Sequence, residues 1–175
     1  METTIKKGIL QDIDELEQLY DSLNDSLAKG INYPGWKKGI YPIRENAIDG
    51  IESNCLYIAR NDGKIVGSII LNHQPESVYH ETAWRIDEDY ANILVVHTLV
   101  VHPDYFHIGV GKTLMDFSCE LGKEMNMKSI RLDVYHKNMP AISLYERSGF
   151  QYIATVDLGL GHYGLDWFHL YEKLI

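Results

Sequence analysis

The segment from Ile93 to Tyr135 constrains the fold more than any other part of this sequence. ILVVHTLVV (93–101) has the β-branched content of a buried strand, and SIRLDVY (129–135) alternates apolar residues as a second strand does. Between them, apolar residues recur near the helical period at Leu114, Phe117, Leu121 and Met125. A strand, a helix and a second strand in this order predict a parallel strand pair joined by a right-handed crossover.

The flanking segments add two helices and a hairpin on the N-terminal side. TTIKK reads as an opening strand, Asp12 as the cap of a helix that ends at Gly30, and Pro42 as the start of a second helix. CLYIARNDGKIVGSIIL is the clearest hairpin, because two β-rich runs flank Asn61-Asp62-Gly63. The polar stretch that follows, up to Tyr90, is predicted to be a long connection.

On the C-terminal side, Asn138 can cap a helix that ends before Gly149, and FQYIATVDL and LDWFHLYEKLI read as closing strands. The predicted order is β-α-α-β-β-β-α-β-α-β-β. An antiparallel hairpin and a central parallel pair predict an α/β fold with a mixed, α+β-like sheet. The 175 residues fit one domain, 1–175.

Charge and cysteine content exclude several classes of protein. A formal net charge of −9 argues against nonspecific nucleic-acid binding, which depends on neutralising phosphates. No apolar run approaches the roughly 20 residues of a membrane helix, and the N-terminus does not resemble a signal peptide. Cys55 and Cys119 lie far apart without metal-type spacing, so that a reducing cytoplasm is the expected location.

The loop HPDYFHIGVGKTLM (102–115) resembles two nucleotide-binding motifs but matches neither. A Walker A loop that ends in Gly111-Lys112-Thr113 needs glycine at position 106, where this chain has Phe106. A dinucleotide fingerprint that starts at Gly109 needs a third glycine at Leu114. A P-loop kinase or NTPase is therefore disfavoured.

A third template fits the loop better: a strand, a Pro-containing turn, and Gly-x-Gly at the start of a helix. The amides from His107 to Lys112 would then converge on an anion such as a pyrophosphate, without Mg²⁺. The alternative is a tight turn in which Gly109 and Gly111 only allow close packing. The loop alone does not distinguish the two.

The loop together with RLDVYHKNMPAISLYERSGF resembles the GNAT superfamily of acyl-CoA-dependent N-acetyltransferases. The second segment, Asn-x-x-Ala-Ile-x-Leu-Tyr-Glu-Arg-Ser-Gly-Phe, is a long match to the family's second signature, and the element order extends the likeness over the chain. The resemblance implies a GNAT-like fold. It also implies transfer of an acetyl group from acetyl-CoA to a primary amine of a small molecule or peptide, by direct attack in a ternary complex.

The resemblance also implies roles for single residues. Tyr145 is the candidate acid that protonates the leaving thiolate. His97 lies where some family members have Glu, and its imidazole makes it the candidate base; the alternative is a histidine at the strand surface without a role. The acidic 81–90 segment holds rival bases: Glu81, Asp87, Glu88, Asp89 and Tyr90. The cofactor-binding residues that the resemblance implies are Leu99, Val100, Val101, His107, Ile108, Gly109, Val110, Gly111, Lys112, Asn138 and Tyr145.

One residue departs from the family pattern. The family usually has Gln or Arg three residues before the first loop glycine, where this chain has Phe106. A side-chain contact to the pyrophosphate at that position is therefore in doubt, and Lys112 is left to supply charge. The histidines at 97, 102 and 107 span strand, turn and loop, so that no metal site is expected.

Aromatic residues are available to line a pocket for the amine acceptor. INYPGWKKGIYP, the 73–90 connection and LGLGHYGLDW would form the acceptor pocket, with Tyr33, Trp36 and Tyr90 as substrate contacts and Trp84 and Tyr163 nearby. Each aromatic could instead be ordinary packing. A second class of function is a CoA-binding sensor or interaction module without catalysis, and the C-terminal strands could pair in a homodimer.

Overall fold

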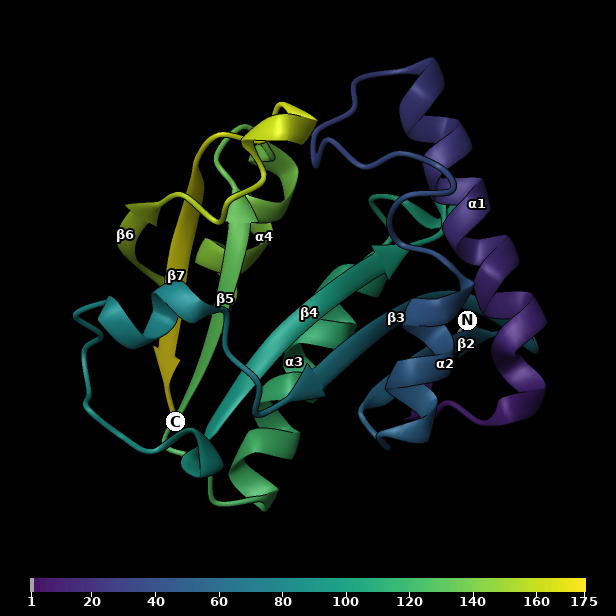
Figure 1. The fold of residues 1–175 in the computed structure, drawn as a ribbon. Coiled ribbons are helices and arrows are strands. Elements are labelled where there is room, and N and C mark those ends of the chain that lie inside the picture. Colours follow the sequence, from purple (N-terminus) through teal and green to yellow (C-terminus); the bar gives the residue numbers. More distant parts are fainter. Residues whose placement is uncertain (1) are drawn as a thin grey trace. The chain divides into compact units, whose positions relative to one another are not determined.

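The structure is a computed structural model that describes residues 2–175. The chain forms two compact units. The first contains the residues up to Asn32 with residues 36–71 and 97–117, and the second contains residues 33–35, 72–96 and 118–175. Strand β4 (Ile93–Val101) and helix α3 (Val110–Glu124) contribute to both units. Figure 1 traces the elements along the chain.

The first unit is built on an antiparallel ladder. Strand β1 (Thr4–Lys7) pairs with β2 (Leu56–Asn61), and β2 pairs with β3 (Lys64–Asn72), whose last residue belongs to the second unit. The predicted hairpin is confirmed: Asp62 and Gly63 connect β2 and β3 with φ values of 49° and 79°. A type I′ hairpin turn needs positive φ at both central positions, and Asp-Gly supplies it at low cost.

Helices α1 (Ile13–Lys29) and α2 (Arg44–Glu52) lie beside one another in the first unit. The buried side chains of α1 recur at helical spacing: Ile13, Leu16, Leu19, Tyr20, Leu23 and Leu27. They share one core with Ala47 and Ile51 of α2 and with Leu56 and Ile58 of β2. Burying each large apolar side chain stabilises the fold by about 1.5–3 kcal/mol, and this core therefore holds both helices on the strands.

Two helix starts differ from the prediction. Helix α2 begins at Arg44 rather than at Pro42, because Ile43 is its N-cap and the Asn46 side chain accepts from the Ile43 N–H at 2.8 Å. Asp12 is the N-cap of α1, as predicted, but its carboxylate does not cap the helix. The carboxylate accepts from the Ile9 N–H at 2.9 Å and pairs with the Arg60 guanidinium at 2.7 Å, a stronger partner than a helix amide.

The second unit contains the predicted parallel pair. The start of β4 pairs with β5 (Ser129–Tyr135), with Ile93 opposite Ser129 and Val95 opposite Arg131. Strand β5 then pairs antiparallel with β7 (Phe168–Leu174), and β7 pairs antiparallel with β6 (Gln151–Val156). Helix α4 (Met139–Arg147) follows β5 directly.

The seven strands form one mixed sheet in the order β1-β2-β3-β4-β5-β7-β6. The predicted mixed α/β fold and its element order are therefore confirmed. The 73–92 connection is irregular apart from two short 3-10 turns, Ser77–Glu81 and Tyr90–Asn92. Within residues 2–175, no helix has the length and apolar character needed to cross a membrane.

Candidate active site

The second half of β4 contains a strained residue. Thr98 has φ 49°, in the left-handed region, and is only 9% exposed. A β-branched residue rarely adopts this conformation, which costs about 1–3 kcal/mol and persists only where the surroundings hold it. His97 and Leu99, two predicted site residues, flank Thr98 and are half-buried. Such strain concentrates at functional sites, and it marks this part of β4 as a candidate.

A 3-10 turn, Pro103–Tyr105, carries the chain from β4 into the loop. The His102 N–H donates to the Val66 carbonyl of β3 at 2.8 Å, and His102 Nδ1 accepts from the Asp104 N–H at 3.2 Å. Phe106 follows the turn with its side chain exposed, and its N–H donates to the Pro103 carbonyl at 3.2 Å. The Phe106 amide is thus used within the turn, and its ring offers no polar group to an anion.

The glycine at position 109 is required by its backbone angle and not by packing. Gly109 has φ 95°, and a Cβ built there would meet no atom of residues 2–175 within 4 Å. His107 also has positive φ, at 65°. The packing alternative for the loop is therefore excluded at Gly109. The space beside this residue is open to a ligand.

Helix α3 begins immediately after Gly109. Its first hydrogen bond runs from the Thr113 N–H to the Gly109 carbonyl at 2.9 Å. The amides of Val110, Gly111 and Lys112 precede this bond and have no acceptor within the helix. Together with the positive end of the helix dipole, they form a set of donors that suits a pyrophosphate. The residues present therefore fit the phosphate end of CoA.

The cation of Lys112 has a partner within the helix. Its ammonium forms an ion pair with the Asp116 carboxylate, one turn further along α3. Both side chains are about half exposed, and exposed pairs of this spacing contribute little to stability. A bound phosphate could therefore replace Asp116 as the partner of Lys112.

Gly67 of β3 is a close-packed residue beside the candidate site, and the sequence did not reveal its role. A Cβ there would lie 2.9 Å from the Val100 carbonyl oxygen of β4 and 3.0 Å from Val110 Cγ1 at the start of α3. The glycine therefore allows α3 and β4 to approach β3 closely. A glycine inside a strand pattern is the only sequence signal for such an approach.

The second unit holds the other predicted cofactor residues. Asn138 is the N-cap of α4, and its side-chain oxygen accepts from the Ala141 N–H at 3.4 Å, a long contact. Tyr145 lies two residues before the end of α4, is 6% exposed, and has its ring 6.2 Å from that of Phe150. The predicted cap is confirmed. The strand and loop residues thus belong to the first unit, and Asn138 and Tyr145 to the second.

Two of the segments predicted to form the acceptor pocket meet in the second unit. A Cβ on Gly35, in the stretch Tyr33–Gly35, would lie 2.3 Å from Leu165 Cδ2. Tyr163, in the same turn as Leu165, is 45% exposed. In the first unit, the Trp36 ring packs edge-on against Tyr41, with 5.3 Å between centroids.

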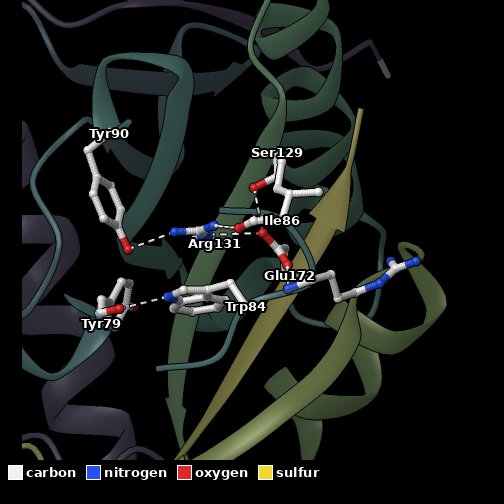
Figure 2. A network of polar contacts seen from close by, with 8 residues as sticks. Tyr79, Trp84, Ile86, Tyr90, Ser129, Arg131 and Glu172 are labelled. Carbon is white, nitrogen blue, oxygen red and sulfur yellow. Dashed lines mark hydrogen bonds and ion pairs between the residues drawn. The ribbon is translucent and has the colours of Figure 1, made fainter. Parts of the chain in front are cut away.

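The 73–90 connection is the third segment predicted to form the acceptor pocket, and a buried ion pair binds it (Figure 2). Arg131 of β5 donates from Nε to Glu172 Oε1 of β7 at 2.9 Å, and the two side chains are 2% and 0% exposed. The Ser129 hydroxyl donates to the same oxygen, and the Arg85 N–H donates to the other at 2.8 Å. Every carboxylate oxygen of Glu172 therefore has a donor, as a buried charge requires.

The Arg131 guanidinium also holds the aromatic residues of the connection. It donates to the Tyr90 hydroxyl at 2.9 Å and to the Ile86 carbonyl at 2.8 Å, and it lies 4.4 Å from the Trp84 ring centroid. The Trp84 indole in turn donates to the Tyr79 carbonyl, as Figure 2 shows. Burial raises the pKa of the Tyr90 phenol, and Arg131 opposes part of that rise. Arg131 thus engages the hydroxyl of Tyr90, one of the predicted substrate contacts.

The acidic rivals of His97 lie in the second unit, and two of them accept hydrogen bonds from residues of the same connection. Glu88 accepts from the Asn92 side chain at 2.9 Å, and Asp89 accepts from the Ala91 N–H at 2.7 Å. Asp87 and Glu88 also line an open cavity of about 540 Å³, whose other lining residues are Ile86, Lys128, Leu174 and Ile175. Among residues 2–175, no three His, Cys, Asp or Glu side chains gather as metal ligands would.

Comparison with known proteins identifies the family. The acetyltransferase (GNAT) family matches residues 16–150. An N-alpha-acetyltransferase from Sulfurisphaera tokodaii is 27% identical over 175 aligned residues, covering 94% of this chain and 87% of that protein. The UPF0157 protein YqkA from Bacillus subtilis is 32% identical over 114 residues, 65% of this chain. This chain covers only 28% of YqkA.

Solved structures share the fold. A GNAT-family acetyltransferase from Streptococcus agalactiae superposes with a TM-score of 0.79 at 20% identity, covering 99% of this chain and 95% of that one. Ard1 from Thermoplasma volcanium superposes with a TM-score of 0.73, also at 20% identity, covering 100% and 99%. The family match spans most of the chain and includes the loop and α4. The chain therefore belongs to the acetyltransferase (GNAT) family of enzymes.

Proposed function

We propose that this protein transfers an acetyl group from acetyl-CoA to a primary amine of a small molecule or peptide, by direct attack in a ternary complex. The proposal rests on the structure at the start of α3. There, Gly109 leaves open space beside amides that precede the first helical hydrogen bond. Family membership points to the same cofactor. We also retain three predictions: a single N-acyltransferase domain over residues 1–175, a cytoplasmic location and a homodimer.

In this proposal the main chain binds the cofactor. The amides from His107 to Lys112 hold the pyrophosphate, and Leu99, Val100 and Val101 offer main-chain groups to the pantetheine arm. Asn138 adds a side-chain amide, since its long contact to Ala141 leaves room for a second partner. Bound acetyl-CoA supplies an activated acyl group and a thiol leaving group.

Two side chains move protons. Tyr145, which is buried, holds a proton on its phenol oxygen and donates it to the leaving sulfur. His97, half-buried beside Thr98, accepts the proton that the amine loses. Tyr33 and Trp36 contact the acceptor. Tyr90 contributes its ring, since its hydroxyl is held by Arg131.

The loop can be tested with Gly109→Ala. Alanine at φ 95° is strained by about 1–2 kcal/mol, so that the loop should leave its native conformation. We expect acetyl-CoA to bind about tenfold more weakly, which corresponds to ~1.4 kcal/mol, in isothermal titration calorimetry. Gly63→Ala is the matched control, because Gly63 also has positive φ (79°) and open space, but lies in the β2–β3 turn.

The control should lose a similar amount of stability and keep its affinity for acetyl-CoA. If Gly109→Ala and wild type bound acetyl-CoA with equal affinity, the loop would have no role in cofactor binding. Thermal-shift assays with acetyl-CoA and ATP in parallel separate an acetyltransferase from an NTPase. Consumption of acetyl-CoA with a panel of amines then separates an enzyme from a CoA-binding module that lacks catalysis.

The base can be identified from the pH dependence of turnover. If His97 accepts the proton, His97→Ala should lower kcat by about 10²-fold or more and abolish the ascending limb of the pH–rate profile near neutrality. Glu88→Gln and Asp89→Asn, measured in the same way, should keep the limb. Persistence of the limb in His97→Ala, with its loss in either acidic variant, would assign the base to the 81–90 segment instead.

A further inference from the structure

The strained Thr98 has a specific partner in the first unit. The Tyr41 phenol and the Thr98 hydroxyl share a hydrogen bond, although the two residues lie 57 positions apart in sequence. Thr98 is buried, and its φ of 49° is unfavourable for a β-branched residue. A contact from outside the strand is what such a conformation needs to persist. Tyr41 supplies that contact from the loop between α1 and α2.

Tyr41 is itself held at several points. Its N–H donates to the Lys37 carbonyl at 3.0 Å, and its carbonyl accepts from the Asn24 side chain of α1 at 3.1 Å. The Trp36 ring packs edge-on against it, and the Asn32 side chain donates to the Trp36 carbonyl at 2.7 Å. Tyr41 is therefore fixed through both its backbone and its ring. A side chain that is to hold another residue in place needs such fixing.

Tyr20, a second tyrosine near Tyr41, differs in its hydrogen bonding. Tyr20 of α1 is 1% exposed, and its hydroxyl finds no hydrogen-bond partner within the described chain. Burial raises the pKa of Tyr20 to about 12. The hydroxyl of Ser68 in β3 lowers this pKa, and Tyr41 adds a smaller rise. Of these two adjacent tyrosines, only Tyr41 reaches β4 through a hydrogen bond given by the structure.

We propose that Tyr41 is a positioning residue: through Thr98 it holds β4 in the conformation that aims the main chain of Leu99–Val101 at the acyl-pantetheine arm. This inference rests on the proposed function. It also links the predicted acceptor contact Trp36, which packs on Tyr41, to the strand predicted to bind the acyl group. Tyr41 touches neither substrate in this proposal, and it acts only through Thr98.

The test is a double-mutant cycle between Tyr41→Phe and Thr98→Gly. Phenylalanine keeps the ring packing but removes the hydrogen bond, and kcat should fall about tenfold with the KM for acetyl-CoA within about twofold of wild type. Glycine adopts φ 49° without support. In the Thr98→Gly background, Tyr41→Phe should therefore change kcat by less than about twofold. Thr98→Ser, which keeps the hydroxyl, should behave like wild type.

Tyr20→Phe is the matched control, because it removes a buried phenol oxygen near Tyr41 without touching Thr98, and it should leave kcat unchanged. An equal fall in kcat on Tyr41→Phe in both backgrounds would overturn the proposal. Hydrogen exchange of the peptide that contains residues 97–101 gives a readout independent of activity. It should be faster in Tyr41→Phe than in wild type or Tyr20→Phe, and an unchanged rate would also overturn the proposal. If wild type acetylates no amine, the proposed function fails, while hydrogen exchange still decides whether Tyr41 holds β4.

Discussion

Tyr145→Phe is expected to lower kcat by about 10²-fold or more, because it removes the proton that the proposed mechanism gives to the leaving sulfur. The phenyl ring keeps the buried packing with Phe150, so that the fold should be preserved. The dissociation constant for acetyl-CoA, measured by isothermal titration calorimetry, should not change. A fall in kcat without a loss of affinity is the signature of a group that acts in the transition state.

Tyr171→Phe is the control for this experiment. Tyr171 is 2% exposed, and its hydroxyl donates to Glu146 of α4 at 3.0 Å, so that the variant also removes a phenol oxygen beside this helix. It should cost about 1 kcal/mol of stability and leave kcat unaltered. If Tyr145→Phe turned over as fast as wild type at saturating substrates, Tyr145 would not be the acid.

Arg131→Ala is expected to lower the free energy of unfolding by about 3–5 kcal/mol, since it leaves the Glu172 carboxylate buried without its cation. The variant also removes the donors to the Tyr90 hydroxyl and the Ile86 carbonyl, which hold the 73–92 connection. Urea denaturation followed by circular dichroism measures the loss. Proteolysis within the 73–92 connection should become faster as well.

The exposed pair Lys123–Glu120 provides the comparison. Both side chains are more than half exposed, and exposed pairs are worth little. Lys123→Ala should therefore change the unfolding free energy far less than Arg131→Ala. If both variants lost a similar amount of unfolding free energy, burial of the Arg131–Glu172 pair would not increase its contribution to stability.

The local elements were predictable because each depends on residues close together in sequence. Asp62-Gly63 specifies a hairpin turn by its backbone preference, and the apolar spacing of α1 follows from one buried face. The start of α2 was wrong by two residues, because the cap is made by Ile43 and Asn46 rather than by Pro42. Helix ends depend on such side-chain contacts more than on periodicity.

The candidate site was predictable to a smaller extent. Gly109 stood out by its spacing, but only the structure shows that its φ is 95° and that the space beside it is open. Gly67 was missed because a strand glycine does not reveal which backbone approaches it. The charge of Lys112 follows from its residue type, while its pairing with Asp116 depends on the helix geometry.

The amino-acid sequence alone was sufficient for the mixed fold, the crossover between the parallel strands and the family, since these depend on periodicity, turn residues and two contiguous motifs. The tertiary structure was needed for contacts between distant positions: Tyr41 with Thr98, and Arg131 with Glu172. Neither pair leaves a periodic signal, because a hydrogen bond or a buried ion pair depends on where chain segments meet in space. Those contacts hold β4 and the 73–92 connection in place.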